Sequence, residues 1–378
     1  MALNLNHPSL LRKQAYIDGA WAKADDGATF DVVNPADGEV IATVPDLTPV
    51  ETERAVEAAH AAWPAWRSKT AKERAGILRR WHGLILEHQD DLAALMTAEQ
   101  GKPLAESAGE VLYGASFIEW FAEEGKRLYG DVVPTHLPDR RILVIRQGVG
   151  VVACITPWNF PNAMITRKAA PAMAAGCPVV IKPAAETPLS ALALAMLAEE
   201  AGVPPGVFNI VTSTRSREVG EVLTESPLVR KFSFTGSTAV GKQLIRQCAS
   251  TVKKVSMELG GNAPFIVFDD ADIDAAVQGA IVSKYRNAGQ TCVCANRLYV
   301  QDGVYDEFVE KFIVATRELV VGRGDQDGVN VGPMISETAI EKVEGLLEDA
   351  TDKGAAVVAG GGRHDLGGRF FEPTVVRD

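Results

Sequence analysis

The sequence predicts an α/β protein whose main part is an open parallel sheet. Four short apolar runs, each followed by a segment of helical character, lie at residues 149–155, 178–181, 207–211 and 231–234. Such alternation is typical of βαβ units, in which helices join parallel strands. The 378 residues, 47% of them hydrophobic, suffice for a large core and suggest two or more domains.

The part before residue 148 reads as strands followed by helices. Residues 15–22 and 30–33 alternate as strands do, and a turn at residues 34–38 precedes a further strand at 39–44. Apolar side chains then recur at helical spacing through residues 77–92. We expect Gly101-Lys102-Pro103 to end that helix and another helix to run to about Leu128.

Residues 140–146 form a short β-rich segment between Pro138 and Gly148. We interpret it as an arm that pairs with another subunit. Beyond it, the loops that follow the parallel strands are where ligands are expected, because open sheets bind ligands at the carboxyl ends of their strands. No G-x-G-x-x-G follows the first of these strands, so motif reading alone does not assign a nicotinamide cofactor.

Composition excludes several classes of protein. The net charge is 38 − 49 = −11, without long single-sign blocks, so nucleic acid is an improbable partner. No apolar run approaches the roughly 20 residues that span a bilayer, and residues 1–8 lack the pattern of a signal peptide. Five cysteines, an odd number, argue against a disulfide framework. We expect a cytoplasmic protein without membrane contact and without a metal site.

Three separated segments together supply the parts of an acyl-transfer site. A cysteine follows a helical run in Asn287-Ala288-Gly289-Gln290-Thr291-Cys292-Val293-Cys294. An amide donor, Asn159, lies in the loop after the first parallel strand, and a carboxylate, Glu258, precedes a Gly-Gly pair. A thiol nucleophile, a donor for an oxyanion and a base are what acyl transfer requires.

On these motifs the chain resembles the aldehyde dehydrogenase superfamily, and more narrowly the succinate-semialdehyde dehydrogenases. The resemblance covers essentially the whole chain. Six motifs carry it in order: Glu99-Gln100-Gly101-Lys102-Pro103, Pro157-Trp158-Asn159-Phe160-Pro161, Lys182-Pro183-Ala184, Phe234-Thr235-Gly236-Ser237-Thr238, Met257-Glu258-Leu259-Gly260-Gly261 and Gly289-Gln290-Thr291-Cys292. It implies NAD(P)-dependent oxidation of an aldehyde to a carboxylate through a covalent thioester, and 4-aminobutyrate breakdown as the setting.

The resemblance also implies a division of the chain. A Rossmann-type NAD(P)-binding domain is expected at residues 1–135 and 150–258, a small β oligomerisation arm at 136–149 and an incomplete α/β catalytic domain at 259–378. The complete protein is expected to be a homodimer or a homotetramer.

For catalysis, the resemblance makes Cys292 the nucleophile and Glu258 the activator of the hydrolytic water. The Asn159 amide and the Cys292 backbone N–H are the expected donors to the oxyanion. The alternatives are a loop-ordering hydrogen bond for Asn159 and an exposed strand-end carboxylate for Glu258.

For the cofactor, the resemblance assigns Lys182 to the adenosine ribose and Gly236 with Ser237 to the pyrophosphate, at a helix N-terminus that attracts anions. Ala185 stands where many NAD-preferring relatives carry a glutamate, and Arg215 and Arg217 follow a nearby strand, so NADP is slightly favoured over NAD. The alternative is that both arginines are solvated. The remaining expected cofactor contacts are Thr156, Pro157, Trp158, Ala184 and Leu259.

For the substrate, Arg167 and Arg286 match positions that bind a distal carboxylate, which selects an aldehyde bearing that group. Glutarate semialdehyde is one methylene longer and is expected to be poorly discriminated from succinate semialdehyde. The alternative is that these arginines lie at the surface or in ion pairs. Cys294 suggests a redox switch, a reducible disulfide with Cys292, against the alternative of a small buried residue.

The chain ends at Asp378, where the family continues to a Glu-Ile-Phe-Gly-Pro motif. Two interpretations follow: a competent dehydrogenase, if this is a fragment of a longer chain, or a truncated relative that at most binds nucleotide. A cofactor-free thiol esterase is disfavoured, since Lys182 and Ser237 would then have no role.

Overall fold

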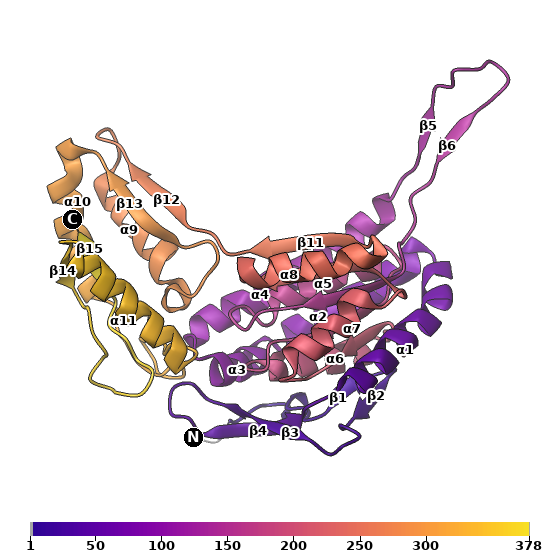
Figure 1. Cartoon of the computed structure of the whole chain (residues 1–378), viewed down its shortest axis with the longest axis horizontal. Coiled ribbons are helices and arrows are strands. Elements are labelled where there is room, and N and C mark those ends of the chain that lie inside the picture. The colour runs from indigo at the N-terminus through magenta and orange to yellow at the C-terminus, as the bar shows by residue number, and fades with distance from the viewer. Residues whose placement is uncertain (1–2, 378) are drawn as a thin grey trace.

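A computed structural model describes residues 3–377, which form two lobes (Figure 1). The larger lobe, residues 3–259, is built on a seven-stranded sheet in the order β11-β10-β7-β8-β9-β1-β2. The strands β11, β10, β7, β8 and β9 are parallel to one another, and β1 is antiparallel to both of its neighbours, β9 and β2. The strands are β1 (Ala15–Ile17), β2 (Ala20–Ala22), β7 (Val151–Ile155), β8 (Val179–Lys182), β9 (Phe208–Ile210), β10 (Val229–Gly236) and β11 (Lys254–Leu259).

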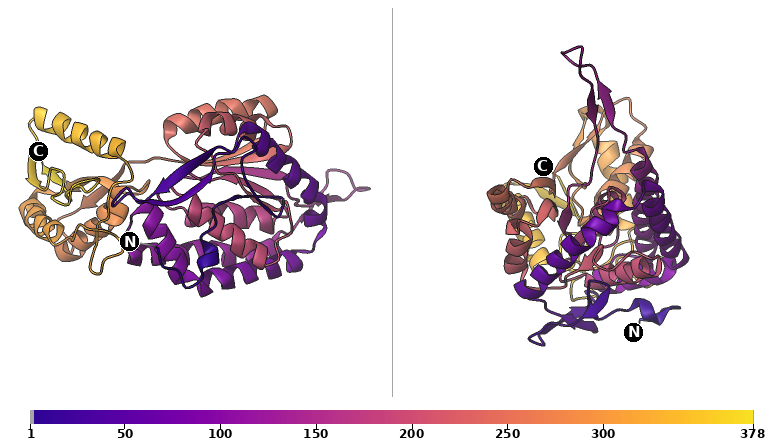
Figure 2. Two further views of the ribbon diagram at one scale, coloured as in Figure 1. Left: turned by 90° about the horizontal axis from the view of Figure 1, so that it is seen from below. Right: turned by 90° about the vertical axis from the view of Figure 1, so that its right-hand side faces the viewer.

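Helices cover both faces of this sheet (Figure 2). Alternate residues of each central strand pack into two different cores, so that Val152 and Cys154 face one core while Val151 and Ala153 face the other. Burial on both faces explains the continuous apolar runs in the sequence. The helices are α1 (Pro49–Ser68), α2 (Ala71–Glu87), α3 (Gln89–Gln100), α4 (Leu104–Glu124), α5 (Ala163–Ala174), α6 (Pro188–Glu200), α7 (Ser216–Glu225) and α8 (Thr238–Cys248).

The single helix expected through residues 77–92 is wrong, because two helices meet at His88, where ψ is 22°. The break places Asp90 and Asp91 in the first turn of α3, where carboxylates are favourable. Helix α3 ends as expected at Gly101, whose φ of 94° suits a left-handed cap.

Two hairpins lie outside the main sheet: β3 (Thr29–Val33) with β4 (Val40–Pro45), and β5 (Asp131–Val133) with β6 (Ile142–Val144). The second, here called the arm, projects away from the body (Figure 1). Its first strand begins at residue 131, ahead of the expected boundary at 136. The sequence did not indicate this strand, because three residues are too few to show the alternation of a strand. Val132 and Leu143 in the arm are 75% and 70% exposed.

The smaller lobe, residues 260–377, follows β11 directly. A parallel pair, β12 (Ala263–Val267) and β13 (Ala295–Val300), packs on helices through a core that includes Val277, Phe308 and Phe312. Its other elements are α9 (Ile273–Tyr285), α10 (Tyr305–Arg317), α11 (Glu337–Asp352), β14 (Ala356–Ala359) and β15 (Val375–Arg377). The 3₁₀ helices of the chain are η1 (Pro8–Leu10), η2 (Gly125–Arg127), η3 (Ala249–Thr251), η4 (Arg286–Gly289) and η5 (Asp302–Val304). Within residues 3–377, no helix is both long and apolar enough to cross a membrane.

Candidate active site

Cys292 lies in the loop between α9 and β13 of the smaller lobe. Helix α9 ends at Tyr285, and the chain then turns sharply, because Asn287 and Ala288 both have φ of 53°. This left-handed turn carries the chain into the Cys292 loop, where the Cys292 side chain is exposed. An exposed thiol can meet a substrate, as a nucleophile must.

Asn159 reaches this loop from the larger lobe. It lies between β7 and α5, and its Nδ2 donates to the backbone oxygen of Gln290 at 3.0 Å. An amide nitrogen carries two N–H groups, so this bond orients the side chain and leaves a second donor. The expected amide donor and the expected nucleophile therefore lie on contacting loops. Such contact between segments that lie far apart in the chain cannot be read from the sequence.

Glu258 lies near the carboxyl end of β11 and is exposed. Three residues later, a Cβ on Gly261 would lie 3.2 Å from the Cys292 backbone oxygen, so the segment after Glu258 passes directly against the Cys292 loop. A side chain on residue 261 would crowd that backbone, which gives the second glycine of the Gly-Gly pair a packing reason. All three predicted catalytic residues thus come from segments that meet where the lobes join.

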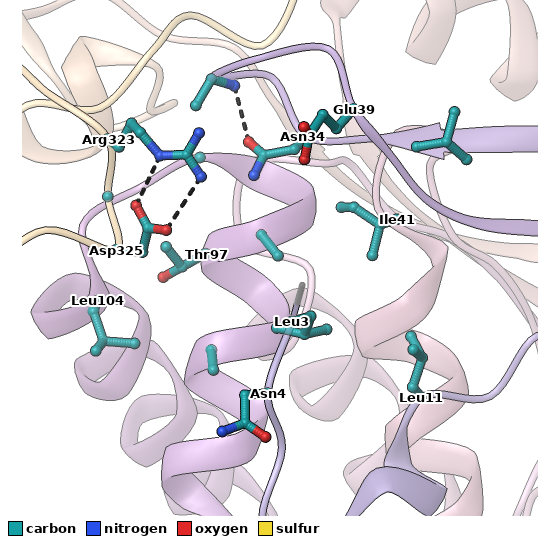
Figure 3. Close-up of a pocket in the computed structure, with 16 residues that line it drawn as sticks. Leu3, Asn4, Leu11, Asn34, Glu39, Ile41, Thr97, Leu104, Arg323 and Asp325 are labelled. Carbon is teal, nitrogen blue, oxygen red and sulfur yellow. Dashed lines mark hydrogen bonds and ion pairs between the residues drawn. The ribbon is translucent and has the colours of Figure 1, made fainter. Parts of the chain in front are cut away.

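A cavity of about 790 Å³ lies at this junction. Its wall includes Trp158, Asn159, Gly261, Gln290 and Thr291. Another cavity, of about 520 Å³, lies between the N-terminal segment, the β3–β4 turn, α3 and residues 323–325 (Figure 3). It contains none of the predicted site residues, and Arg323 there is already paired with Asp325 at 3.1 Å. The first cavity is lined by two predicted site residues, Trp158 and Asn159, and by Thr291, the residue before Cys292; Cys292 and Glu258 are not in its wall.

The predicted cofactor residues gather at the carboxyl ends of the parallel strands. Lys182 ends β8 and is only 2% exposed, and its Nζ donates to the Pro183 oxygen at 3.3 Å. Burial lowers the pKa of Lys182 to about 8. The hydroxyls of Thr156 and Thr235, after β7 and on β10, are buried and find no hydrogen-bond partner among residues 3–377. Unpaired buried donors of this kind suit a polar ligand.

Ser237 is the N-cap of α8, because its Oγ accepts from Val240 N at 3.3 Å. It follows Gly236 at the end of β10, so the N-terminus of α8 opens toward the same edge of the sheet. Leu259, at the end of β11, packs against Gly241 of α8, where a Cβ would lie 2.5 Å from a Leu259 methyl group. Pro157, Ala184 and Ala185 lie half-buried in the loops after β7 and β8.

The two predicted substrate arginines approach one apolar patch from different lobes. The guanidinium of Arg286 lies 4.9 Å from the Phe160 ring centre, and Arg167 Nη1 lies 3.9 Å from Met164 Sδ. Phe160 and Met164 pack together in one cluster. Across residues 3–377 neither guanidinium forms an ion pair, so both charges are available to a ligand.

A sequence profile described as the aldehyde dehydrogenase family matches residues 21–378. The chain belongs to the aldehyde dehydrogenase family. It is 63% identical over 376 residues to the glutarate-semialdehyde dehydrogenase of Pseudomonas aeruginosa, with 100% of this chain and 78% of that protein covered. It is 62% identical over 376 residues to the Escherichia coli succinate-semialdehyde dehydrogenase named for NADP(+), again with 100% and 78% covered.

Among solved structures, the chain is similar to an NADP dependent enzyme of Escherichia coli, with a TM-score of 0.98 and 62% identity over 99% of this chain and 77% of that chain. The family resemblance and the aldehyde dehydrogenase-like α/β fold expected from the sequence are confirmed. These two relatives differ in the substrate that they are named for, so the family alone does not fix the aldehyde.

Arg215 and Arg217 differ in their surroundings in this aldehyde dehydrogenase. Arg215 already pairs with Asp26 at 3.0 Å and lies 3.8 Å from Asp46, whereas Arg217 is exposed on the first turn of α7. The negative charges of Glu186 and Asp46 partly offset the effect of burial on the pKa of Lys182, the residue predicted to hold the ribose. Arg217 is therefore the freer of the two for an added phosphate.

Cys294 is buried while Cys292 is exposed, and both are free thiols. The Cys294 Sγ lies 2.7 Å from Thr291 Oγ1 and donates to the Lys284 oxygen at 3.3 Å. A disulfide between the two would require Cys294 to leave these partners. The redox switch stays a prediction.

Sequence reasoning missed the buried polar residues behind the site. Glu99 accepts from Leu189 N and Ser190 N, at 2.7 and 2.8 Å, and so holds the start of α6 after the Lys182 loop. Lys102 and Asn287 contact the Asn159 backbone oxygen at 2.7 and 3.1 Å. The motif Glu99-Gln100-Gly101-Lys102-Pro103 was a signal for two of them, but it served only as a family marker.

Proposed function

We propose that this chain oxidises an aldehyde that bears a distal carboxylate, with succinate semialdehyde as the first substrate and NADP or NAD as the hydride acceptor. The hydrogen bond from Asn159 to the Gln290 oxygen carries this proposal, because it joins the amide donor of one lobe to the nucleophile loop of the other. Glutarate semialdehyde is the alternative substrate, since one methylene changes binding by only about 1 to 3 kcal/mol.

The first step uses Cys292 and Asn159. The Cys292 thiolate adds to the aldehyde carbon, and the carbonyl π electrons move to oxygen. The second N–H of the Asn159 amide and the Cys292 backbone N–H then stabilise the oxyanion. Donors that are already oriented cost no reorganisation during the reaction, and the Asn159 bond to Gln290 supplies that orientation.

Oxidation and hydrolysis follow on the same cysteine. As the oxyanion collapses, the carbon–hydrogen bond breaks with its electron pair, and a thioester remains on Cys292. A nicotinamide bound at the strand ends would supply the acceptor for that hydride. Glu258 then takes a proton from water as the water oxygen adds to the thioester. The carbon–sulfur bond breaks, which releases the carboxylic acid and restores the thiolate.

The strand ends fit such a cofactor. Lys182 is buried, and its Nζ donates to its neighbour's carbonyl; it would also donate to ribose hydroxyls, and the N-terminus of α8 at Ser237 would face the pyrophosphate. The partnerless hydroxyls of Thr156 and Thr235 add hydrogen-bonding groups at the same edge of the sheet. Trp158 and Leu259 would line the path to the nicotinamide.

Preference for NADP is part of the proposal. Ala185 leaves no carboxylate to repel a 2′-phosphate, and the exposed Arg217 is a charged donor on α7, which follows β9, the strand that pairs with the Lys182 strand β8. We expect kcat/KM for NADP to exceed that for NAD, and Arg217→Ala to lower the NADP value about tenfold while NAD changes little. Steady-state rates with each cofactor measure this, and equal or better turnover with NAD contradicts the preference.

The distal carboxylate is assigned to Arg167 and Arg286. Within residues 3–377 neither guanidinium has a carboxylate partner, and each contacts a residue of the patch at Phe160 and Met164, so both can offer charge-assisted hydrogen bonds to an anion. The patch itself suits the methylene chain between the aldehyde and the carboxylate. The relatives named for succinate and glutarate semialdehyde support an aldehyde of this kind.

We expect Arg286→Ala to lower kcat/KM for succinate semialdehyde by about 10- to 100-fold, because a charge-assisted bond is worth about 1.5 to 3 kcal/mol. Propanal, which lacks the carboxylate, should lose less than about threefold. Arg246→Ala, on the exposed face of α8, is the matched control. An unchanged kcat/KM for succinate semialdehyde would mean that Arg286 does not bind the carboxylate.

Regulation by Cys294 is a further part of the proposal. A disulfide with Cys292 removes the nucleophile until a reductant restores it. Peroxide should therefore inactivate the enzyme, and dithiothreitol should restore the activity of the wild type but not of Cys294→Ala, in which Cys292 oxidises further. Full recovery of Cys294→Ala, or none of the wild type, counts against the switch.

Assembly and location complete the proposal. Val132 and Leu143 on the arm are apolar and exposed, which suits pairing with a second copy in a homodimer or homotetramer. The solution mass of Val132→Asp against the wild type tests this pairing. Five free cysteines fit a reducing compartment, so we place the protein in the cytoplasm, with a role in 4-aminobutyrate breakdown.

A further inference from the structure

A buried ion pair lies directly behind the proposed oxyanion site. Lys102 Nζ lies 2.6 Å from Glu110 Oε2, and the two side chains are only 1% and 0% exposed. Lys102 comes from the segment between α3 and α4, and Glu110 from α4. Buried charges are costly unless they are paired and fully hydrogen-bonded, so a pair at this depth calls for a reason.

The Lys102 ammonium makes two hydrogen bonds and one cation–π contact. Besides Glu110, Nζ donates to the backbone oxygen of Asn159 at 2.7 Å and lies 4.2 Å from the centre of the Phe160 ring. Glu110 uses its other oxygen to accept from Asn162 N and Ala163 N, at 2.9 and 3.1 Å. The pair therefore holds the loop after β7 at two points, at Asn159 in its middle and at the start of α5.

The smaller lobe also binds the backbone of Asn159. Asn287 Nδ2 donates to the Asn159 backbone oxygen at 3.1 Å, and Gln100 Nε2 donates to Asn287 Oδ1 at 2.9 Å. The backbone N–H of Asn287 donates to Glu106 at 2.9 Å. Asn287 is buried and adopts a left-handed φ of 53°, a strained conformation that this network of bonds holds in place.

The segment that carries Lys102 is tightly packed against backbone of the smaller lobe. A Cβ on Gly324 would lie 2.4 Å from the Lys102 oxygen, and one on Gly332 would lie 2.1 Å from the Gly101 oxygen. Leu104 N donates to the Gly324 oxygen at 2.8 Å. Backbone of the smaller lobe thus fixes the position of the Lys102 backbone, and Glu110 fixes the position of the Lys102 ammonium group.

We propose that Lys102, held by Glu110, is a positioning residue that fixes the backbone of Asn159 and so aims the Asn159 amide at the oxyanion on Cys292. The inference rests on the proposed role of Asn159. Lys102 does not touch the reacting atoms, and it contacts the loop after β7 at Asn159 and Phe160 rather than at the predicted cofactor residues Thr156, Pro157 and Trp158. Its loss should therefore slow the chemical step and leave cofactor binding alone.

A double-mutant cycle tests this. We expect Lys102→Met to lower kcat about 10- to 100-fold, and Asn159→Ala to lower it at least as much. Because Lys102 acts through the amide, Lys102→Met in the Asn159→Ala background should cost less than about threefold more. The Kd for NADP, from tryptophan fluorescence, should change less than about twofold. Lys311→Met, in an exposed ion pair with Asp274, is the matched control and should keep its kcat.

A second variant keeps the test decisive if Lys102→Met leaves Glu110 unpaired and does not fold. Lys102→Met/Glu110→Gln removes both charges and keeps an amide oxygen for the two backbone N–H groups at Asn162 and Ala163. It enters the same cycle, with kcat referred to the concentration of NADP-binding sites. Fully multiplicative losses with Asn159→Ala, or an equal loss of NADP affinity, overturn the inference and leave the proposed function standing. Full activity of Asn159→Ala overturns the proposed role of Asn159 itself.

Discussion

Cys292→Ala should lower kcat by at least about 10⁴-fold, because no covalent intermediate can form without the thiolate. The exposed side chain of Cys292 lies in a loop rather than in a core, so its removal should leave the fold intact. Binding of NADP should also persist, since the predicted cofactor residues lie on other strands. Absorbance of the reduced nicotinamide measures the rate, and fluorescence titration measures NADP binding.

Cys294→Ala is the matched control for this result. It removes a thiol two residues away that is buried against Lys284 and Thr291. Under reducing conditions it should keep its activity within about threefold. Turnover by Cys292→Ala, or an equal loss in both variants, would show that Cys292 is not the nucleophile.

Glu258→Gln should slow hydrolysis of the thioester more than its formation. We expect steady-state kcat to fall about 10²- to 10⁴-fold, the usual contribution of a general base. Hydride transfer precedes the step that needs Glu258, so a burst of about one reduced nicotinamide per active site should survive. Stopped-flow absorbance separates the burst from the steady rate.

The control for this variant is Glu57→Gln, an exposed carboxylate on α1 far from the lobe junction, which should behave as wild type. Loss of the burst together with the steady rate would place Glu258 before hydride transfer instead. An unaltered kcat would make it the exposed strand-end carboxylate that the sequence also allowed.

The parallel sheet could be predicted because its strands and helices leave a local pattern of apolar residues in the sequence. Strands such as β7 and β8 are buried on both faces and therefore appear as short continuous apolar runs with a helix after each. The helix break at His88 could not be predicted from that pattern, because apolar spacing continues across it. The first strand of the arm could not be predicted either, because it is short and wholly exposed and so leaves no pattern of buried apolar residues.

The candidate site was predictable as residue types but not as an arrangement. Cys292, Asn159 and Glu258 stand out by their chemistry and motifs, yet the contact between the Asn159 amide and Gln290 depends on how two lobes meet. Lys102 and Glu110 are harder still, because charged side chains are expected at the surface and only the fold shows them buried together.

The central claim, a thioester on Cys292, is tested most directly by trapping it. Glu258→Gln is mixed with succinate semialdehyde and NADP, quenched in acid after one turnover, and the Cys292 peptide is analysed by mass spectrometry. The account predicts a succinyl group on Cys292 that forms only when NADP is present, in amount equal to the NADPH produced. Stoichiometric NADPH without any acyl group on Cys292 would contradict it.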